Sequence, residues 1–328
     1  MVLFAAPQRG WQFARFEQEV ARRTRAGAEV IYLSLGEAKL DVQGVDRLLR
    51  DPRLEAVCTG AHDGRNTEVI IDLRRCTFAD PYGLTAVHAL CTRVAPRVAS
   101  VWVCLPVSPG VQSYLSVAGL ADGIHSCGVE LVGGPQGDIR PSGRCEVLLP
   151  IRSVASELDA AQASAAARDR VGGMLSRLDW RPDVADGMVS AIMEVTMNVV
   201  EYAETSGYLA VQGYRLDNRD GFVVAAISDG GVGIRGTLSR KYGDLADSSV
   251  ADDVVLGRLF DEGLSARAGK VCGLGMRTLQ DAVQSIGGRL DVRSGRGLRR
   301  QVRRRVMLST TAPIPGTHIR LELRRRSP

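Results

Sequence analysis

Short apolar runs alternate with amphipathic stretches along the first 132 residues. The runs are four to seven residues long and rich in β-branched side chains, which is typical of buried strands. The stretches between them repeat apolar residues at helical spacing. Strands are predicted at 29–35, 68–73, 100–105 and 129–132, and helices at 8–27, 45–57, 82–94 and 111–118. This alternation predicts an α/β domain over 28–132, preceded by a helical leader at 1–27.

Residues 133–144 (GGPQGDIRPSGR) are rich in glycine and proline and predict a linker to a second domain at 145–328. The helices of that domain are predicted at 155–178, 183–203 and 274–286, and its strands at 145–151, 208–216, 222–228, 289–293, 305–309 and 317–323. The sequence DNRDG predicts a hairpin turn between two of these strands. The weak pattern of 234–271 predicts a long loop, and such loops often act as lids.

Composition narrows the class of protein. Hydrophobic residues make up 45% of the 328 positions and charged residues 24%, as in globular proteins. No apolar run approaches the roughly 18 residues needed to span a bilayer, and no secretory signal is recognised, so we expect a cytoplasmic protein without a membrane partner. The seven cysteines are scattered and lack metal-ligand spacing, which predicts reduced, buried thiols and no zinc site.

The net charge of +5 is concentrated in one place. Eight arginines lie between residues 289 and 305, namely Arg289, Arg293, Arg296, Arg299, Arg300, Arg303, Arg304 and Arg305. One interpretation is a hairpin tip whose charges point into water. The other is a docking patch for an acidic partner or for the phosphates of a nucleic acid.

Two polar residues on the helix predicted at 183–203 are candidates for chemistry. Glu194 and Asn198 are four positions apart and therefore project from one helix face. An amide oxygen can ligate Mg²⁺, and a carboxylate can orient or deprotonate a nucleophile. Taken alone, this pair is equally typical of a solvated helix face.

An aspartate stands at the end of an apolar strand, in the sequence SDGGVG. Asp229 is an acceptor suited to the amino group of adenine, and Gly231 and Gly233 let the backbone approach a base closely. An ordinary turn explains the same residues equally well.

Glycines also open the helix predicted at 274–286, in the sequence Gly273-Leu274-Gly275-Met276. Free N–H groups at such a helix start bind anions, and Arg267 and Lys270 precede them in the predicted lid. Gly316 and Thr317 open the last strand, where the threonine hydroxyl can support the aspartate.

The order of these four motifs resembles the GHKL superfamily of ATP-binding domains over residues 145–328. The resemblance implies an α/β sandwich with a mixed sheet that is covered on one side by helices. It further implies that Asp229 holds adenine, Asn198 binds Mg²⁺, and Glu194 acts as the general base. Residues 273–276 would then cover the phosphates of ATP.

Residues 28–132 resemble a STAS domain, the α/β fold of anti-sigma-factor antagonists. The resemblance rests on VIIDLRRCTFADPYGLTAV and on SYLSVAGLADGI. Family members carry a phosphorylatable serine directly after the aspartate, whereas this chain has Pro81 followed by Tyr82. The family's phosphoswitch therefore cannot operate at that position, and a docking, dimerisation or internal pseudo-partner role is expected.

Two functions follow from these resemblances. The first is a serine/threonine protein kinase of the anti-sigma type in partner-switching signalling, with a separate STAS protein or sigma-factor-like regulator as its partner. The alternative is an ATP-gated module or slow ATPase that controls a protein or nucleic-acid surface, with the arginine-rich segment as effector. Both functions are compatible with a homodimer. A sensor histidine kinase is disfavoured, because none of His62, His88, His125 and His318 lies in a long helix before the ATP-binding domain.

Overall fold

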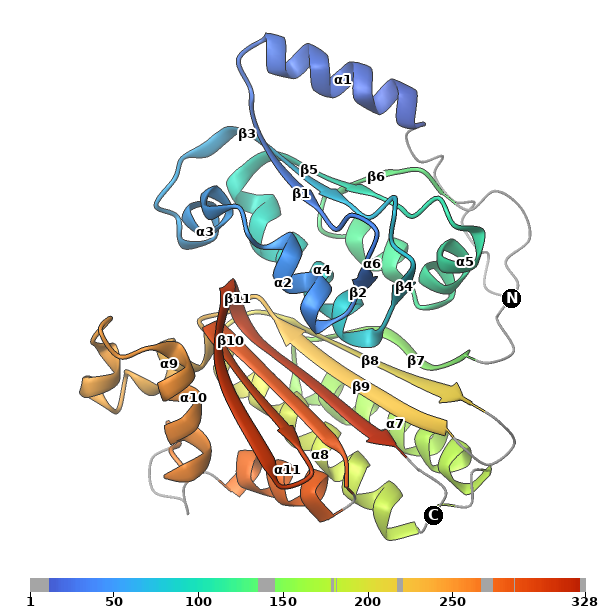
Figure 1. The fold of residues 1–328 in the computed structure, drawn as a ribbon, viewed down its shortest axis with the longest axis vertical. Helices are drawn as coiled ribbons and strands as arrows, with labels where there is room; N and C mark the ends of the chain where they lie inside the picture. Colours follow the sequence, from blue (N-terminus) through green and yellow to red (C-terminus); the bar gives the residue numbers. More distant parts are fainter. Residues whose placement is uncertain are drawn as a thin grey trace.

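The chain folds into two α/β halves that are stacked on each other (Figure 1). The structure is a computed structural model that describes residues 12–134, 145–177, 180, 182–216, 221–266, 274–285 and 287–324. One half contains a parallel sheet of strand order β1-β3-β5-β6, and the other an antiparallel sheet of order β10-β11-β9-β8-β7. The α/β class predicted from the sequence is therefore confirmed, but the mixed sheet predicted for the C-terminal half is wrong, because all four strand pairs of that sheet are antiparallel.

The N-terminal half begins with a helix that covers the outer face of its sheet. Helix α1 (Phe13–Arg25) buries Phe16 against Trp102, with the two ring centroids 5.4 Å apart. The strands are β1 (Glu29–Ser34), β2 (Lys39–Leu40), β3 (Gly64–Asp72), β4 (Phe78–Ala79), β5 (Val98–Cys104) and β6 (Glu130–Val132). The helices on the inner face are α2 (Val42–Leu48), α3 (Pro52–Thr59), α4 (Pro81–Val94), α5 (Pro109–Val117) and α6 (Leu120–His125), and a short 3₁₀ turn follows α4 (Ala95–Arg97).

One predicted helix, 45–57, is wrong as a single element. It is divided between α2 and α3, because Pro52 cannot continue a helix from the preceding turn. Asp51 instead caps the new helix by accepting a hydrogen bond from the N–H of Arg53 (3.0 Å).

The C-terminal half places its helices on one face of the antiparallel sheet (Figure 1). The strands are β7 (Cys145–Val154), β8 (Gly207–Arg215), β9 (Gly221–Asp229), β10 (Arg289–Val302) and β11 (Arg305–Arg324). The helices are α7 (Glu157–Arg177), α8 (Pro182–Tyr202), α9 (Gly233–Leu238), α10 (Asp252–Asp261) and α11 (Leu274–Ser285), with a 3₁₀ turn at Gly243–Ala246. The predicted DNRDG turn and most of the predicted linker lie outside the described residues.

The predicted loop at 234–271 is wrong over about half of its length, and residues 267–271 lie outside the described residues. Helices α9 and α10 and the 3₁₀ turn occupy this stretch up to Asp261. Buried residues such as Leu238, Leu245 and Phe260 anchor these short helices in the core. The helices are too short for their apolar spacing to stand out from the many Gly, Asp and Ser residues.

The three strands predicted after residue 288 are also wrong, because they form two long strands. Strands β10 and β11 make one hairpin that bends at Gly295 and Gly297, where the register shifts. Gly295 has a positive φ of 57°, which suits glycine at such a bend. The hairpin then folds back, so that the N–H of Arg303 donates to the carbonyl of Gly288 (3.1 Å).

This folded hairpin overturns the interpretation of the arginine-rich segment as a solvated tip. Arg293 and Arg299 are buried, and Arg300 reaches back to pair with Asp291 (2.6 Å). Four of the eight arginines are exposed, namely Arg296 and, at the turn itself, Arg303, Arg304 and Arg305.

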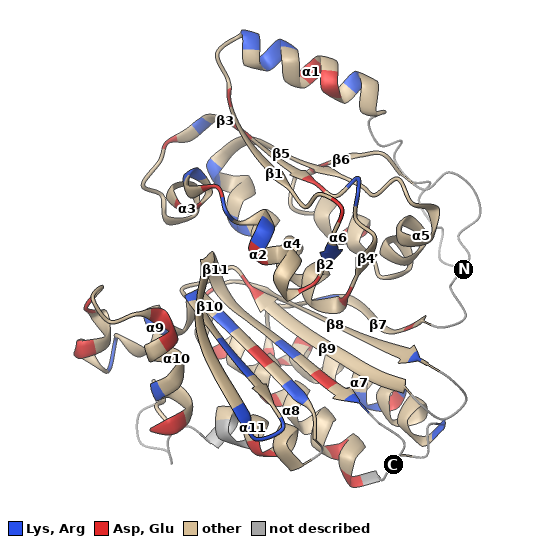
Figure 2. Cartoon of the chain, in the orientation of Figure 1, with Lys and Arg blue, Asp and Glu red and all other residues tan. Residues whose placement is uncertain are grey.

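The two faces of the antiparallel sheet differ in chemistry. One face is apolar and packs on the C-terminal helices, with Leu290, Val292, Ile319 and Leu321 among its buried residues. Because side chains alternate along a strand, the other face carries charged and polar groups, as the colours along β10 and β11 show in Figure 2. These groups are Arg289, Asp291, Arg293, His318, Arg320 and Glu322, with Ser228, Tyr208 and Gln212 on the neighbouring strands.

The N-terminal half covers this polar face. Helix α4 packs on β8, β9 and β11, so the helix layer of the first half lies between the two sheets (Figure 1). One apolar cluster includes residues from both halves, such as Leu84 of α4 and Ala226 of β9. The two halves therefore share a core across their interface.

Two further expectations concern the chain as a whole. Of the cysteines in the described part of the chain, Cys58, Cys76, Cys91 and Cys104 are buried, Cys127 and Cys145 are half-buried, and all six are free. No helix among the described residues is long and apolar enough to cross a membrane.

Candidate functional site

Asp229, whose carboxylate is predicted to bind adenine, is the last residue of β9, the central strand of the sheet. Asp229 is 3% exposed, and the preceding residue, Ser228, bonds to the N-terminal half through Thr85 (2.9 Å). Since neighbouring side chains of a strand point to opposite faces, Asp229 lies on the side of the C-terminal helices. Its carboxylate is therefore accessible only from that layer and from the loops that follow.

The glycines predicted around Asp229 do come together. A Cβ atom on Gly231 would lie 1.9 Å from the carbonyl oxygen of Ala203, at the end of α8. A Cβ atom on Gly316 would lie 2.0 Å from the carbonyl oxygen of Asp229. Gly233 and Gly316 also have positive φ angles of 70° and 79°. Only glycine therefore fits at these positions, and two motifs that are 85 residues apart meet at one carboxylate.

Burial dominates the electrostatics of this carboxylate. It raises the pKa of Asp229 to about 6, and the backbone N–H groups of Gly231 and Thr317 partly oppose the rise by donating to the carboxylate. The Gly231 nitrogen lies 2.9 Å from Oδ1. The carboxylate keeps unused acceptor sites, which a ligand amino group can take.

A serine that the sequence did not single out connects the two glycine segments. The hydroxyl of Ser294 donates to the carbonyl of Gly316 (2.8 Å) and accepts from the N–H of Ile234 (2.9 Å). A lone serine in a strand carries no sequence signal, so only the pairing of β10 with β11 identifies it.

The segment after the Asp229 turn is fixed by Arg235 and Asp252, which the sequence also did not indicate. Arg235 binds Asp252 (2.7 Å) and donates to the carbonyls of Leu245 (2.8 Å) and Val250. Asp252 in turn accepts from the N–H of Arg296 in the folded hairpin (2.7 Å). These bonds hold α9, α10 and the hairpin as one unit beside the candidate site.

The structure places the predicted base and metal ligand on α8. Glu194 and Asn198 are both half-buried, and within the described residues neither side chain has a hydrogen-bond partner. Val199, next to Asn198, packs on Gly207, which pairs with Asp229 across β8 and β9. Asn198 therefore lies near the end of the sheet that carries Asp229.

The predicted phosphate-binding residues lie only partly within the described part of the chain. Arg267, Lys270 and Gly273 lie outside the described residues. Leu274 and Gly275 begin α11, but only their backbone is described, and Met276 is half-buried against the apolar core between the antiparallel sheet and the C-terminal helices. The segment leading to them is held at Ser265, whose carbonyl accepts from Lys241 (2.9 Å).

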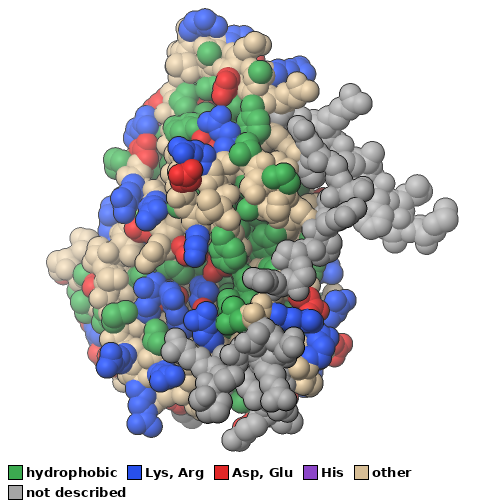
Figure 3. Space-filling view, turned by 45° about the vertical axis from the view of Figure 1, so that its right-hand side comes forward, with side chains coloured by type: hydrophobic (Ala, Val, Ile, Leu, Met, Phe, Trp, Pro, Cys, Tyr) green, Lys and Arg blue, Asp and Glu red, His purple; other side chains and the backbone are tan. Residues whose placement is uncertain are grey.

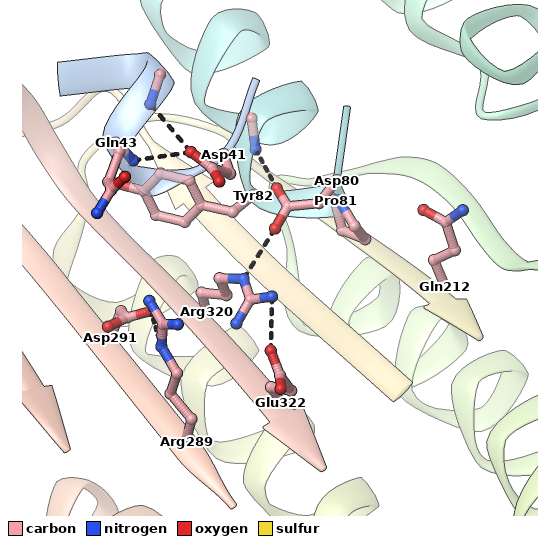
Figure 4. Close-up of polar contacts among 12 residues, drawn as sticks. Asp41, Gln43, Asp80, Pro81, Tyr82, Gln212, Arg289, Asp291, Arg320 and Glu322 are labelled. Atoms are coloured by element: carbon pink, nitrogen blue, oxygen red, sulfur yellow. Dashed lines mark hydrogen bonds and ion pairs between the residues drawn. The ribbon is translucent and has the colours of Figure 1, made fainter. Parts of the chain in front are cut away.

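The interface between the halves holds a buried ion pair (Figure 4). Asp80 accepts from Nε of Arg320 (2.8 Å) and from the N–H of Gly83 (3.0 Å), so it caps α4 and binds the sheet. Arg320 also pairs with Glu322 (2.8 Å). A second pair joins Asp46 of α2 to Arg293 (3.0 Å). Neither sequence motif nor spacing indicated these contacts, which join distant parts of the chain.

The residues at the start of α4 are sealed in this interface. Tyr82 is fully buried and its ring lies edge-on to that of His318, with centroids 6.2 Å apart. His88 is 2% exposed and stacks on Tyr208 of β8 at 3.9 Å. Burial lowers the pKa of His318 to about 3 and also lowers the pKa of His88. Both histidines are therefore neutral core residues at pH 7.

No group of three or more His, Cys, Asp or Glu side chains in the described part of the chain can hold a metal ion. Comparison of the chain with protein-family models and with curated proteins found no match.

Proposed function

We propose that the C-terminal half is a GHKL-type domain that binds Mg·ATP, and that the protein is a serine/threonine kinase of the anti-sigma type. The observation that supports this most is the meeting of Gly231, Gly233, Gly316 and Thr317 around the buried carboxylate of Asp229. An acceptor at a strand end, bordered by backbone that no side chain obstructs, suits the amino edge of adenine.

The residues of α8 fit the remaining roles. The amide oxygen of Asn198 is half-buried and has no partner in the described part of the chain, so it is available to Mg²⁺. Glu194, one turn earlier on the helix, can accept a proton from an incoming hydroxyl. Bound Mg²⁺ would neutralise the phosphates, while Glu194 and Asn198 orient the nucleophile and the metal.

The N-terminal half then serves as a STAS-like docking module rather than as a substrate. Pro81 offers no hydroxyl, and Tyr82 is fully buried against the sheet. Helix α4 lies on the face of the sheet opposite to α8, away from the side on which Asp229 lies. The phosphoryl group would therefore pass to a serine of a separate STAS protein.

One observation favours the alternative of an ATP-gated module. Helix α10, which lies within the stretch predicted as a lid, contacts the folded hairpin through Phe260, whose ring centroid lies 3.8 Å from the guanidinium carbon of Arg299. Closure of the lid over ATP would act directly on this hairpin. Positive charges on the face drawn in Figure 3 are interspersed with acidic and apolar side chains, which favours a protein effector over a nucleic acid.

The test follows the γ-phosphate of labelled Mg·ATP in the full chain, with candidate STAS proteins added. Glu194→Gln should retain ATP binding but lower transfer to the partner serine by about 10²–10⁴-fold, because the base is lost. Asp169→Asn, on the exposed face of α7, is the matched control and should keep full transfer.

The remaining outcomes separate the alternatives. Label released as phosphate indicates an ATPase, and label retained on bound ATP indicates the gated module. Absence of ATP binding to the wild-type chain rejects the proposal entirely.

A further inference from the structure

The outer part of the β10–β11 hairpin, residues 297–310, folds back beside the inner part, and we call it the arm. Its two strands pair with each other from Gly297 with Thr310 to Val302 with Arg305. Strand β9 pairs with β11 only from His318 onward. Among the described residues, the outer edge of 305–310 therefore has no neighbouring strand, and its backbone groups are open to another chain.

From residue 306 to residue 310 the arm edge carries no charge and lacks the usual protection. Val302, Val306, Met307 and Leu308 are between 42% and 56% exposed. Natural edge strands usually carry charges, proline or bulges that prevent pairing, but residues 306–310 (VMLST) contain neither a charged residue nor a proline. An unprotected edge of this kind is typical of a site where an extended segment adds as a further strand.

The backbone of the arm is held in place before any partner binds. Arg299 lies over the ring of Phe260 on α10, and a Cβ on Gly257 would lie 3.2 Å from Leu308. The hydrogen bond from Arg303 to Gly288 fixes the turn. A partner strand would therefore meet a pre-organised edge, and ordering the arm would cost little free energy on binding.

Charge at one end of the edge selects the partner. Arg303, Arg304 and Arg305 are exposed, and none of them has an ion pair with a described residue. Their neighbours in sequence are neutralised, since Arg296 pairs with Glu55 (2.5 Å) and Arg300 with Asp291. Three adjacent unneutralised cations attract a partner that brings carboxylates to this end.

We propose that the arm binds an extended segment of another protein as an antiparallel strand. The segment presents small apolar residues along 306–310 and acidic residues at its C-terminal end, opposite Arg303–Arg305. A second copy of this chain fits less well, because antiparallel pairing centred on Leu308 places Thr311, Ala312 and Pro313 opposite the arginines, which supplies no carboxylate.

The test uses a fluorescent peptide of alternating valine and threonine that ends in three acidic residues, with anisotropy as the readout. The full chain should bind this peptide, and a peptide ending in three lysines should bind at least tenfold more weakly. Replacing Arg303, Arg304 and Arg305 together by serine should weaken binding of the acidic peptide by about tenfold, in line with the contribution of several surface charge contacts. Leu308→Asp should weaken the binding of both peptides.

Three exposed arginines elsewhere provide a charge-matched control. Replacing Arg65, Arg168 and Arg170 by serine removes the same charge and should leave binding unchanged. Equal binding of the acidic and basic peptides, or no binding of the acidic peptide to the folded wild-type chain, overturns the proposal. So does a concentration-dependent dimer that Leu308→Asp abolishes, because the occupant would then be a second copy. None of these readouts requires ATP, so the result is independent of the kinase proposal.

Discussion

Thr85 of helix α4 and Ser228 of strand β9 share a buried hydrogen bond of 2.9 Å between their hydroxyl oxygens. The two residues are 143 positions apart, and Ser228 directly precedes Asp229. The N-terminal half therefore contacts one face of strand β9. The carboxylate of Asp229, which we propose binds adenine, lies on the opposite face of the same strand. Docking of the first half and nucleotide binding by the second are expected to depend on each other.

Substitution of Gly230 tests this dependence. A Cβ atom there would lie 2.9 Å from the carbonyl oxygen of Ala89, in the backbone of α4. Gly230→Ala should therefore push α4 away from the sheet, lower the free energy of unfolding by about 1–3 kcal/mol, and weaken ATP binding. Urea unfolding and nucleotide titration measure the two effects.

Gly172→Ala is the control for this substitution, because a Cβ on Gly172 of α7 meets no atom within 4 Å. It should stabilise the protein slightly, by about 0.5–1 kcal/mol, since alanine favours a helix over glycine. An unchanged ATP affinity in Gly230→Ala, with the expected loss of stability, would show that the two halves are not coupled at this point.

Asp229→Asn should raise the stability of the protein at high pH and at the same time abolish ATP binding. Because burial raises the pKa of Asp229 to about 6, the ionised carboxylate costs stability above that pH. Its favourable contribution is complete below its unfolded pKa of about 3.8 and is lost as the pH rises through about 6. Asparagine removes this cost, so the variant should gain more stability relative to wild type at pH 8 than at pH 5, by roughly 1–2 kcal/mol.

The same variant should lose ATP binding. Asparagine replaces one of the two carboxylate oxygens, which accept hydrogen bonds, by an NH₂ group, which donates them. Denaturant unfolding at the two pH values and nucleotide titration at pH 8 give the comparison. A variant that binds ATP as tightly as wild type would remove Asp229 from the proposed adenine site.

The buried His318 predicts a pH dependence of stability that is opposite in sign to that of Asp229. Burial lowers its pKa to about 3, so it contributes stability above its unfolded pKa of about 6.5, and this contribution declines as the pH falls. Between pH 7 and pH 5 the loss should be about 2 kcal/mol. His318→Gln should show a shallower decline than wild type in unfolding experiments, and parallel curves would contradict the assignment.

The ion pair of Asp80 with Arg320 predicts a strongly non-additive double mutant. Asp80→Ala removes the acceptor of the buried Nε of Arg320, which among the described residues keeps only its pair with Glu322 (2.8 Å), and should cost about 3–5 kcal/mol. Replacing Asp80 by leucine and Arg320 by methionine together should recover much of this loss, because both charges of the pair are removed and Glu322 keeps its contact with Arg324 (3.9 Å). Additive effects in a double-mutant cycle would mean that the two side chains do not interact.

The sequence alone determined most of the secondary structure and the local chemistry. Apolar runs and helical spacing located elements such as β3 and α8, because burial of a continuous stripe imposes a regular pattern on the residues that form it. The order of Glu194, Asn198, Asp229 and the glycine pairs also suggested one kind of site without reference to contacts. Local patterns failed where the elements were short, as at α9, or bent by glycines, as in β10.

The tertiary structure alone decided which residues meet. It brings Gly316 to the backbone of Asp229, buries Arg293 in a segment that the sequence presented as a basic patch, and covers a charged sheet face with α4. These contacts join residues that are far apart in the chain, and each depends on how the strands pair and the halves pack. A single sequence carries no direct record of such pairing, because many partners satisfy the same charge or hydrogen bond equally well.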